Sequence, residues 1–258
     1  MGQLILPDTT LCAIVRDEII NPAGGIAKFV KNSVPFVEKA VIVDTGSKDG
    51  TREALEEFSA KYTNLRVLDR PFDGYSSSRN FSLKQAKTHY ALVLDADERL
   101  SHVDFKQLRK ILEQKNEETF SFDVLEIHPD KVEYFPLDSF QRLLKVDDDI
   151  RFDRQVFEIV ERYGAAFSHK PYRTGIAIKH FVPPAGSRER KEAEWYDYAK
   201  EFLRRGGVYA SMKGPMDMPS YDLWKKYFLE SEGVYSKFKD LPSSKLIKME
   251  HERIVVMA

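Results

Sequence analysis

Residues 90–98 read YALVLDADE, a largely apolar run that ends in two aspartates, Asp95 and Asp97. An apolar run of this length, bounded by polar residues, is typical of a buried strand. Two carboxylates at the end of such a strand repel each other unless a cation or water lies between them. Their hard oxygen atoms suit Mn²⁺ or Mg²⁺, which bind carboxylates together with substrate phosphates. A solvated acidic turn is the alternative interpretation of the motif.

The chain before this motif alternates between strand and helix patterns. Strands are predicted at 10–15, 39–43, 65–68 and 90–94, and helices at 25–32, 51–62 and 76–87. This order predicts a mainly parallel, Rossmann-like α/β sheet flanked by helices, because parallel strands need crossover helices between them. Ligands of such sheets bind beyond the carboxyl ends of the strands. Two of those ends, after 39–43 and after 90–94, carry acidic motifs.

The pattern changes after a predicted helix at 102–113. Strands are predicted at 119–127, 140–146, 156–160 and 176–181, and helices at 188–205 and 221–235. Because no long crossover helix separates these later strands, we expect them to pair antiparallel, which gives a mixed later half of the sheet. The helices at the end predict a helical C-terminal region.

Two further motifs lie near predicted strand ends. Asp44 ends a strand and is followed by Gly46 and Gly50, which permit a tight turn, and by Asp49 or Thr51 as a cap of the next helix. A well-built turn explains most of these residues, but it does not explain a carboxylate at the ligand-facing edge. Arg79, near the start of a helix, can pair with a diphosphate, although a surface arginine is the alternative interpretation.

Composition excludes some classes of protein. Lys and Arg number 40 against 41 Asp and Glu, for a net charge of −1, which disfavours a nucleic-acid-binding protein. The single cysteine, Cys12, lies in an apolar run and is predicted to be a buried hydrophobic side chain rather than a nucleophile. We see no signal peptide and no apolar run of about 20 residues, so we expect a cytoplasmic protein.

Three segments together resemble the family 2 glycosyltransferases of the GT-A fold. They are LCAIVRDE (residues 11–18), AVIVDTGSKDGT (residues 40–51) and SSSRNFSLKQAKTHYALVLDADERLS (residues 76–101). Weaker similarity continues through 142–145, 151–160 and 176–181. The resemblance implies a GT-A domain over 1–186, with a nucleotide-sugar-binding half (1–100) and an acceptor half (101–186). A helical accessory region would then occupy 187–258.

The resemblance also implies roles for single residues. Asp44 would contact the nucleotide base of the donor, and Arg79 would face its diphosphate. The metal, Mn²⁺ or Mg²⁺, would be held by Asp95, Asp97 and His180, although a lone histidine after an apolar strand is as often structural. The implied donor-binding residues are Val15, Arg16, Glu18, Asp44, Gly46, Ser47, Arg79, Asp95 and Ala96.

The implied reaction is an inverting transfer of a sugar from a nucleotide-sugar, with a UDP-hexose favoured as donor. Glu158 is the first choice for the catalytic base, and its alternative role is a strand-end acid paired with Arg154 or Arg162. Related sequences often have Val-His-Glu where this chain has Val-Phe157-Glu, which weakens the assignment of Glu158. Many also have Arg-Asn-Glu where Asp17 adds a charge here.

Several alternatives stay open at this point. The acceptor can be a glycan, a lipid-linked molecule, a protein or a small molecule. Trp195, Tyr198, Phe202 and Trp224 favour core packing, with a lid, a homodimer contact or a peripheral membrane contact as alternatives. A non-catalytic nucleotide-sugar-binding protein is the second hypothesis. A sugar-1-phosphate nucleotidyltransferase is disfavoured, because Arg16 and Asp17 stand where those enzymes have a glycine-rich loop.

Overall fold

The computed structural model describes residues 4–19, 21, 25–128, 132–137, 140–153, 158–163, 167 and 169–182. The first half runs through β1 (Leu6–Val15), α1 (Gly25–Ser33), the 3-10 helix η1 (Val34–Phe36), β2 (Val37–Asp44), α2 (Thr51–Lys61), β3 (Leu65–Asp69), α3 (Tyr75–Leu83) and β4 (Tyr90–Val93). The second half runs through β5 (Glu98–Arg99), α4 (His102–Leu112), β6 (Thr119–Ile127), β7 (Val132–Phe135), β8 (Gln141–Lys145), β9 (Ile150–Asp153), β10 (Ile159–Arg162) and β11 (Tyr172–Phe181). The helices predicted at 188–205 and 221–235, and the accessory region 187–258, lie outside the described residues.

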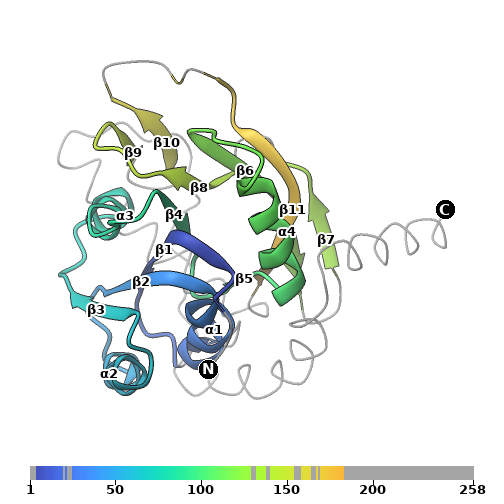
Figure 1. Cartoon of the computed structure of the whole chain (residues 1–258). Helices are drawn as coiled ribbons and strands as arrows, with labels where there is room; N and C mark the ends of the chain where they lie inside the picture. Colours follow the sequence, from blue (N-terminus) through green and yellow to red (C-terminus); the bar gives the residue numbers. More distant parts are fainter. Residues whose placement is uncertain are drawn as a thin grey trace, which may run out of the picture.

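One curved sheet organises the described chain, with the strand order β3-β2-β1-β4-β8-β6-β11-β5 and with β7 paired to β6 (Figure 1). Strands β1 to β4 are parallel to one another where they pair, as the alternating pattern predicts. A separate antiparallel hairpin is formed by β9 and β10. The predicted α/β sheet flanked by helices is therefore confirmed.

The two faces of the sheet have different covers. Leu11, Ala13 and Val15 point into a large apolar core, where α1 and α4 contribute buried side chains that include Phe29 and Phe105. Cys12, between those positions on β1, points to the other face, where α3 and the β9–β10 hairpin pack. The alternation follows from the period of two residues along a strand. Burial raises the pKa of the Cys12 thiol to about 12, which agrees with its predicted role as a buried hydrophobic side chain.

The later strands correct one prediction. As expected, β8 pairs antiparallel with β4 and β6, and β7 pairs antiparallel with β6. However, β11 pairs parallel with β6, so the prediction of antiparallel pairing was wrong for this pair, although β11 is antiparallel to the short strand β5 on its other side. The chain between β6 and β11 runs through β7, β8 and the β9–β10 hairpin. These strands form the crossover connection that is usually a helix between parallel strands. Strands β5, β7 and β9 were not predicted.

Sheet direction brings distant segments of the sequence to one edge. Because β8 runs opposite to both β4 and β6, the carboxyl ends of β1, β2, β4, β6 and β11 all lie at the same edge of the sheet. The start of β8 lies there as well. Ligands of open α/β sheets bind at this edge, so we expect the functional side chains there. Among the described residues, no helix is both long and apolar enough to cross a membrane.

Candidate active site

Asp44 ends β2 next to Val15, the last residue of β1. Its Oδ1 accepts hydrogen bonds from the backbone N–H groups of Gly46 and Ser47, each at 2.9 Å. Gly46 has a φ of +108°, a conformation that side chains rarely adopt, so this turn needs glycine. Asp44 is buried, and its Oδ2 has no hydrogen-bond partner among the described residues. A buried acceptor without a partner is costly, which favours a ligand donor at this position.

The loop after β1 is tied to the loop after β2. The Asp17 N–H donates to Ser47 Oγ at 2.9 Å, and the Glu18 N–H donates to Thr51 Oγ1 at 2.7 Å. Thr51 therefore joins the two loops with its hydroxyl rather than capping α2 with it. The structure thus brings together the predicted donor-binding residues of the two loops, Val15, Arg16, Glu18, Asp44, Gly46 and Ser47. The Arg16 side chain is about half exposed, with a relative accessibility of 51%.

Asp95 lies between two arginines. Arg79 Nη1 is 2.7 Å from Asp95 Oδ1, and Arg142 Nη2 is 3.2 Å from Asp95 Oδ2. Burial alone would raise the pKa of Asp95, but the two guanidinium groups outweigh it and hold this pKa at about 2. Asp95 is therefore a charged anchor for both arginines.

Glu98 and Arg142 complete this cluster, and sequence reasoning identified neither of them. Arg142 Nη2 donates to Glu98 Oε1 at 2.8 Å, while the Asp95 N–H donates to Glu98 Oε2 at 2.9 Å. Burial of Glu98 raises its pKa. The sequence signal for Arg142 is weak: it is one basic residue at the start of a short apolar strand, 44 residues along the chain from Glu98.

Glu158 also contacts Arg79, from the β9–β10 hairpin. Arg79 Nε donates to Glu158 Oε1 at 2.9 Å. The neighbouring Asn80 holds the hairpin on α3, because its side-chain amide donates to the Phe152 carbonyl and accepts from the Phe152 N–H, both at 2.8 Å. The alternative pairing of Glu158 with Arg162 is wrong.

Arg162 instead lies against two other carboxylates, those of Glu118 at 2.5 Å and Asp147 at 2.8 Å. The other partner considered for Glu158, Arg154, lies outside the described residues. Glu158 thus belongs to the cluster around Arg79.

Asp97 faces His180, as the family resemblance implies. His180 Nε2 lies 3.8 Å from Asp97 Oδ2, and the Phe181 N–H donates to the Asp97 carbonyl at 2.9 Å. Burial lowers the pKa of His180, but the carboxylates of Asp97 and Glu126 have a larger, opposite effect and raise this pKa to about 10. A carboxylate oxygen beside an imidazole nitrogen is a donor set that fits a divalent transition metal.

Arg99 supports the Asp95–Asp97 turn from the core. Its Nη1 donates to the carbonyl groups of Ala96 at 2.5 Å and Glu98 at 2.6 Å, and its guanidinium lies 5.4 Å from the centre of the Phe29 ring. Desolvation lowers the pKa of this buried side chain to about 10. Arg99 is therefore a structural residue that holds the turn.

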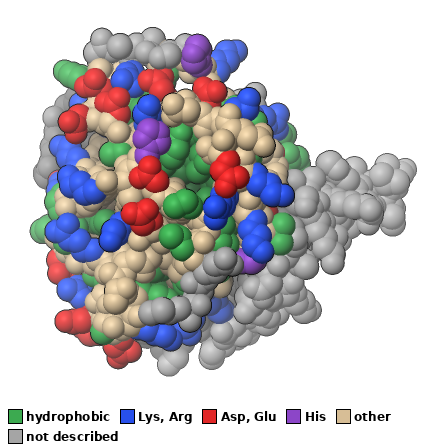
Figure 2. Space-filling view, in the orientation of Figure 1, with side chains coloured by type: hydrophobic (Ala, Val, Ile, Leu, Met, Phe, Trp, Pro, Cys, Tyr) green, Lys and Arg blue, Asp and Glu red, His purple; other side chains and the backbone are tan. Residues whose placement is uncertain are grey.

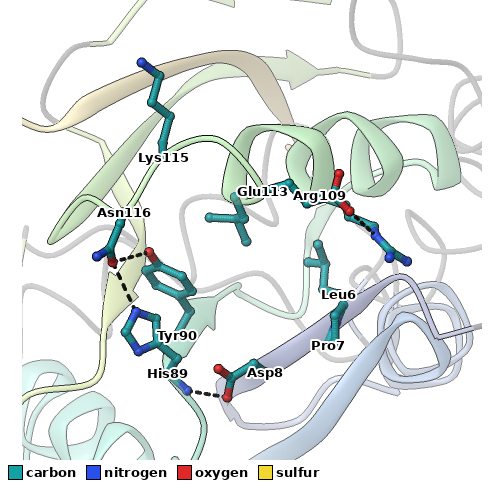
Figure 3. A pocket seen from close by; sticks show the side chains of 10 residues that line it. Leu6, Pro7, Asp8, His89, Tyr90, Arg109, Glu113, Lys115 and Asn116 are labelled. Carbon is teal, nitrogen blue, oxygen red and sulfur yellow. Dashed lines mark hydrogen bonds and ion pairs between the residues drawn. The ribbon is translucent and has the colours of Figure 1, made fainter.

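The surface away from this edge carries mixed charges and a separate pocket. Figure 2 shows one face of the molecule, on which acidic and basic side chains are interspersed. A pocket of about 400 Å³ lies between the end of α4 and the starts of β1 and β4, with Asp8, Tyr90 and Asn116 among its lining residues (Figure 3). Tyr90 donates to Asn116 at one side of the pocket, at 3.3 Å (Figure 3). Since it lies at the amino ends of β1 and β4, it is separate from the site at the carboxyl ends.

Comparison with known proteins extends these observations. A family model described as glycosyl transferase family 2 matches residues 31–178, more than half of the chain. A TPR repeat-containing protein of Synechococcus elongatus is 31% identical over 156 residues, which are 60% of this chain and 36% of that protein. A lipopolysaccharide core biosynthesis glycosyltransferase of Rhizobium meliloti is 35% identical over 108 residues, which are 42% of this chain and 37% of that protein. The chain thus spans about a third of the length of these curated relatives.

A solved structure has the same fold. It is a mannosyltransferase from Pyrobaculum calidifontis in complex with GDP-Man and Mn²⁺, with a TM-score of 0.50, 14% identity, and coverage of 99% of this chain and 83% of that chain. At this identity the similarity concerns the fold alone. The fold is of the GT-A type, as the resemblance implied.

Proposed function

This chain belongs to glycosyl transferase family 2, and on that basis we propose that it transfers a sugar from a nucleotide-diphosphate-sugar to an acceptor hydroxyl group. The observation that carries the proposal is the placement of Asp44, Arg79, Asp95 and Asp97 at one edge of the sheet. These residues come from three separate segments of the sequence. Each offers the kind of group that one part of such a donor requires.

Asp44 is proposed to bind the base. Its Oδ1 is used by the turn, whereas its buried Oδ2 remains for a donor group of the ligand. Uracil and guanine present a ring N–H to such an acceptor at neutral pH, whereas cytosine does not. A UDP-sugar is the donor that we favour.

Arg79 and Arg142 are proposed to bind the diphosphate. Both guanidinium groups are buried and converge on Asp95. Arginine pairs with phosphate oxygens through two parallel hydrogen bonds, so a diphosphate is a suitable competitor for their N–H groups. Asp95 and Glu158 would keep the two arginines in position before the donor arrives.

Asp97 and His180 are proposed to hold a divalent metal. Their carboxylate and imidazole groups face each other at 3.8 Å, whereas Asp95, the third expected ligand, has both carboxylate oxygens paired with arginines. The mixed oxygen and nitrogen set favours Mn²⁺ over Mg²⁺. When bound, such an ion neutralises charge on a departing nucleoside diphosphate.

Glu158 remains our proposed base for an inverting displacement. In this step the acceptor oxygen bonds to the anomeric carbon, the bond from that carbon to the diphosphate breaks, and the hydroxyl proton passes to a carboxylate. The Glu158 side chain is 14% exposed and holds Arg79 through Oε1. Glu158 would therefore both position Arg79, the proposed ligand of the diphosphate, and accept the proton of the acceptor hydroxyl.

A thermal-shift panel tests this proposal. UDP, GDP, CDP and dTDP would each be added to the full chain with and without Mn²⁺. A ligand that binds only the folded state raises the melting temperature. A Mn²⁺-dependent rise with UDP would support the proposal, and radiolabelled UDP-sugars would then be screened against acceptors. No rise with any nucleotide would contradict it and favour a protein that keeps the fold without the donor site.

A further inference from the structure

Glu126, His128 and Glu133 form a second cluster of potential metal ligands, which we call the Glu-His-Glu cluster. Glu126 and Glu133 are direct partners in the antiparallel β6–β7 pair, and His128 follows Glu126 by two residues, directly after the end of β6. All three side chains therefore lie on one face of the hairpin. Their ligand atoms lie within 4.8 Å of one another.

The residues that alternate with the cluster on β6 and β7 lie on the opposite face of this strand pair. Leu125, Ile127 and Val132 pack into a small apolar cluster with the end of β11. Since side chains alternate between the two faces of a sheet, the Glu-His-Glu cluster must point away from these apolar residues. The side chains of Glu126, His128 and Glu133 are 27%, 14% and 39% exposed, so an ion from solvent can reach them.

The spacing of the ligand atoms in this cluster suits a metal ion. Like charges directly opposite each other on paired strands are destabilising. Here the imidazole of His128 lies between the two carboxylates, with Nε2 at 3.3 Å from Glu126 Oε2 and 2.9 Å from Glu133 Oε2. Ligand atoms around a tetrahedral Zn²⁺ are spaced about 3.4 Å apart, given metal–ligand distances of about 2.1 Å. The observed spacings therefore need little change to accommodate the ion.

We propose that Glu126, His128 and Glu133 form a zinc site, distinct from the metal site proposed at Asp97. One imidazole with two carboxylates suits Zn²⁺ better than Mg²⁺ or Ca²⁺, which prefer oxygen ligands alone. Three protein ligands leave a fourth position of a tetrahedral ion open for water.

The two sites adjoin through Glu126. Its Oε2 faces His128, whereas its Oε1 lies 3.8 Å from His180 Nδ1. A zinc ion on the cluster would reduce the negative charge that Glu126 presents to His180. The inference does not depend on the proposed sugar transfer, because it concerns binding of the metal alone.

Zinc titration of the untagged, metal-free full chain tests the proposal. Isothermal calorimetry would be performed on the wild type and on Glu133→Gln, His128→Gln, Asp97→Asn and His169→Gln. We expect Glu133→Gln and His128→Gln each to weaken one Zn²⁺ site by at least about 100-fold, since even residues outside the first ligand set typically contribute 10- to 100-fold. Asp97→Asn should keep that site. His169 is an exposed histidine outside the cluster, so His169→Gln should bind as the wild type does.

Two further measurements guard against loss of folding. Without metal, Glu133→Gln should still melt in one cooperative transition near that of the wild type, because the glutamine oxygen can still accept a hydrogen bond from His128. With Zn²⁺, only the wild type, Asp97→Asn and His169→Gln should gain melting temperature from the cluster site. Co²⁺ would provide a visible absorption band that His128→Gln lacks. Equal Zn²⁺ binding by all five proteins would overturn the proposal and leave an ion-pair cluster.

Discussion

Arg79 Nη1 lies 2.7 Å from Asp95 Oδ1, and the same guanidinium reaches Glu158 through Nε at 2.9 Å. One arginine thus joins α3, the acidic turn after β4 and the β9–β10 hairpin. Its side chain is 7% exposed. Breaking a buried pair leaves an uncompensated charge, so this relationship matters for stability as well as for ligand binding.

Arg79→Ala is expected to lower the free energy of unfolding by about 3–5 kcal/mol, the usual cost of removing one partner of a buried ion pair. Urea unfolding would measure it. The matched control is Arg109→Ala, because Arg109 pairs with Glu113 on the surface of α4 with 48% of its side chain exposed. Such a pair contributes about 0.3–0.5 kcal/mol. Equal effects of the two substitutions would show that the Arg79 cluster is not stabilising.

Glu158→Gln is expected to lower kcat by about 10²- to 10⁴-fold while leaving donor binding intact. The glutamine oxygen can still accept from Arg79 Nε, so the substitution removes basicity and keeps the arginine in place. Glu161→Gln, at an exposed position of β10, is the control. Near-normal turnover by Glu158→Gln would remove this residue from proton transfer and leave it the role of positioning Arg79.

Asp44→Asn is expected to abolish the thermal shift with UDP. The amide oxygen can still accept from Gly46 and Ser47, but an NH₂ group replaces the free Oδ2 and opposes the ring N–H of uracil. Asp69→Asn is the control, because Asp69 is paired in register with Asp44 on β3, yet it is exposed and bonded to Arg52. A retained UDP shift in Asp44→Asn would exclude the proposed base contact.

Mn²⁺ binding is expected to release about one proton between pH 7 and pH 9. The raised pKa of His180, about 10, keeps its imidazole charged in this range, and a metal requires the neutral form. The imidazolium stabilises the metal-free protein fully below the ordinary pKa of about 6.5, and this stabilisation is lost as pH rises through the raised pKa. Calorimetry in buffers of different ionisation enthalpy would count the protons. An unchanged proton count in His180→Ala would refute the role of this residue.

Cys12 is expected not to react with a thiol reagent such as DTNB in the native protein and to react fully in urea. Burial raises its thiol pKa to about 12, and reaction requires an accessible thiolate. Absorbance of the released thiolate would report the labelled fraction. Stoichiometric labelling under native conditions would contradict the placement of Cys12 between β1 and α3.

Much of the donor half could be predicted from local patterns. The strand that ends at Asp44, the strand before Asp95 and the helix that carries Arg79 follow from apolar runs and their periodicity over short stretches. The strand direction follows from the helices between them. These patterns therefore predict that Asp44, Asp95 and Asp97 lie at one edge of the sheet, and the family resemblance implies that Arg79 faces the diphosphate there.

The partners of those residues could not be predicted in the same way. Arg142 lies on a short strand whose pairing with β4 depends on the whole path of the later chain. The pairing of β11 with β5 brings His180 to the acidic turn, whereas the strand pattern alone does not indicate that β11 lies parallel to β6. No local propensity encodes these contacts, because they depend on sheet order over many residues.

Sequence and tertiary structure therefore determined different features of this protein, for a physical reason. Side-chain periodicity acts within about ten residues, and it was enough to predict the strands of the donor half and the carboxylates at their ends. Only the tertiary structure decided which charges meet. Asp95 is held by arginines from α3 and β8, and Glu126 is brought opposite Glu133 and close to His180. Electrostatic interactions between buried groups depend on distance in space, and that distance is set by the closure of the whole sheet.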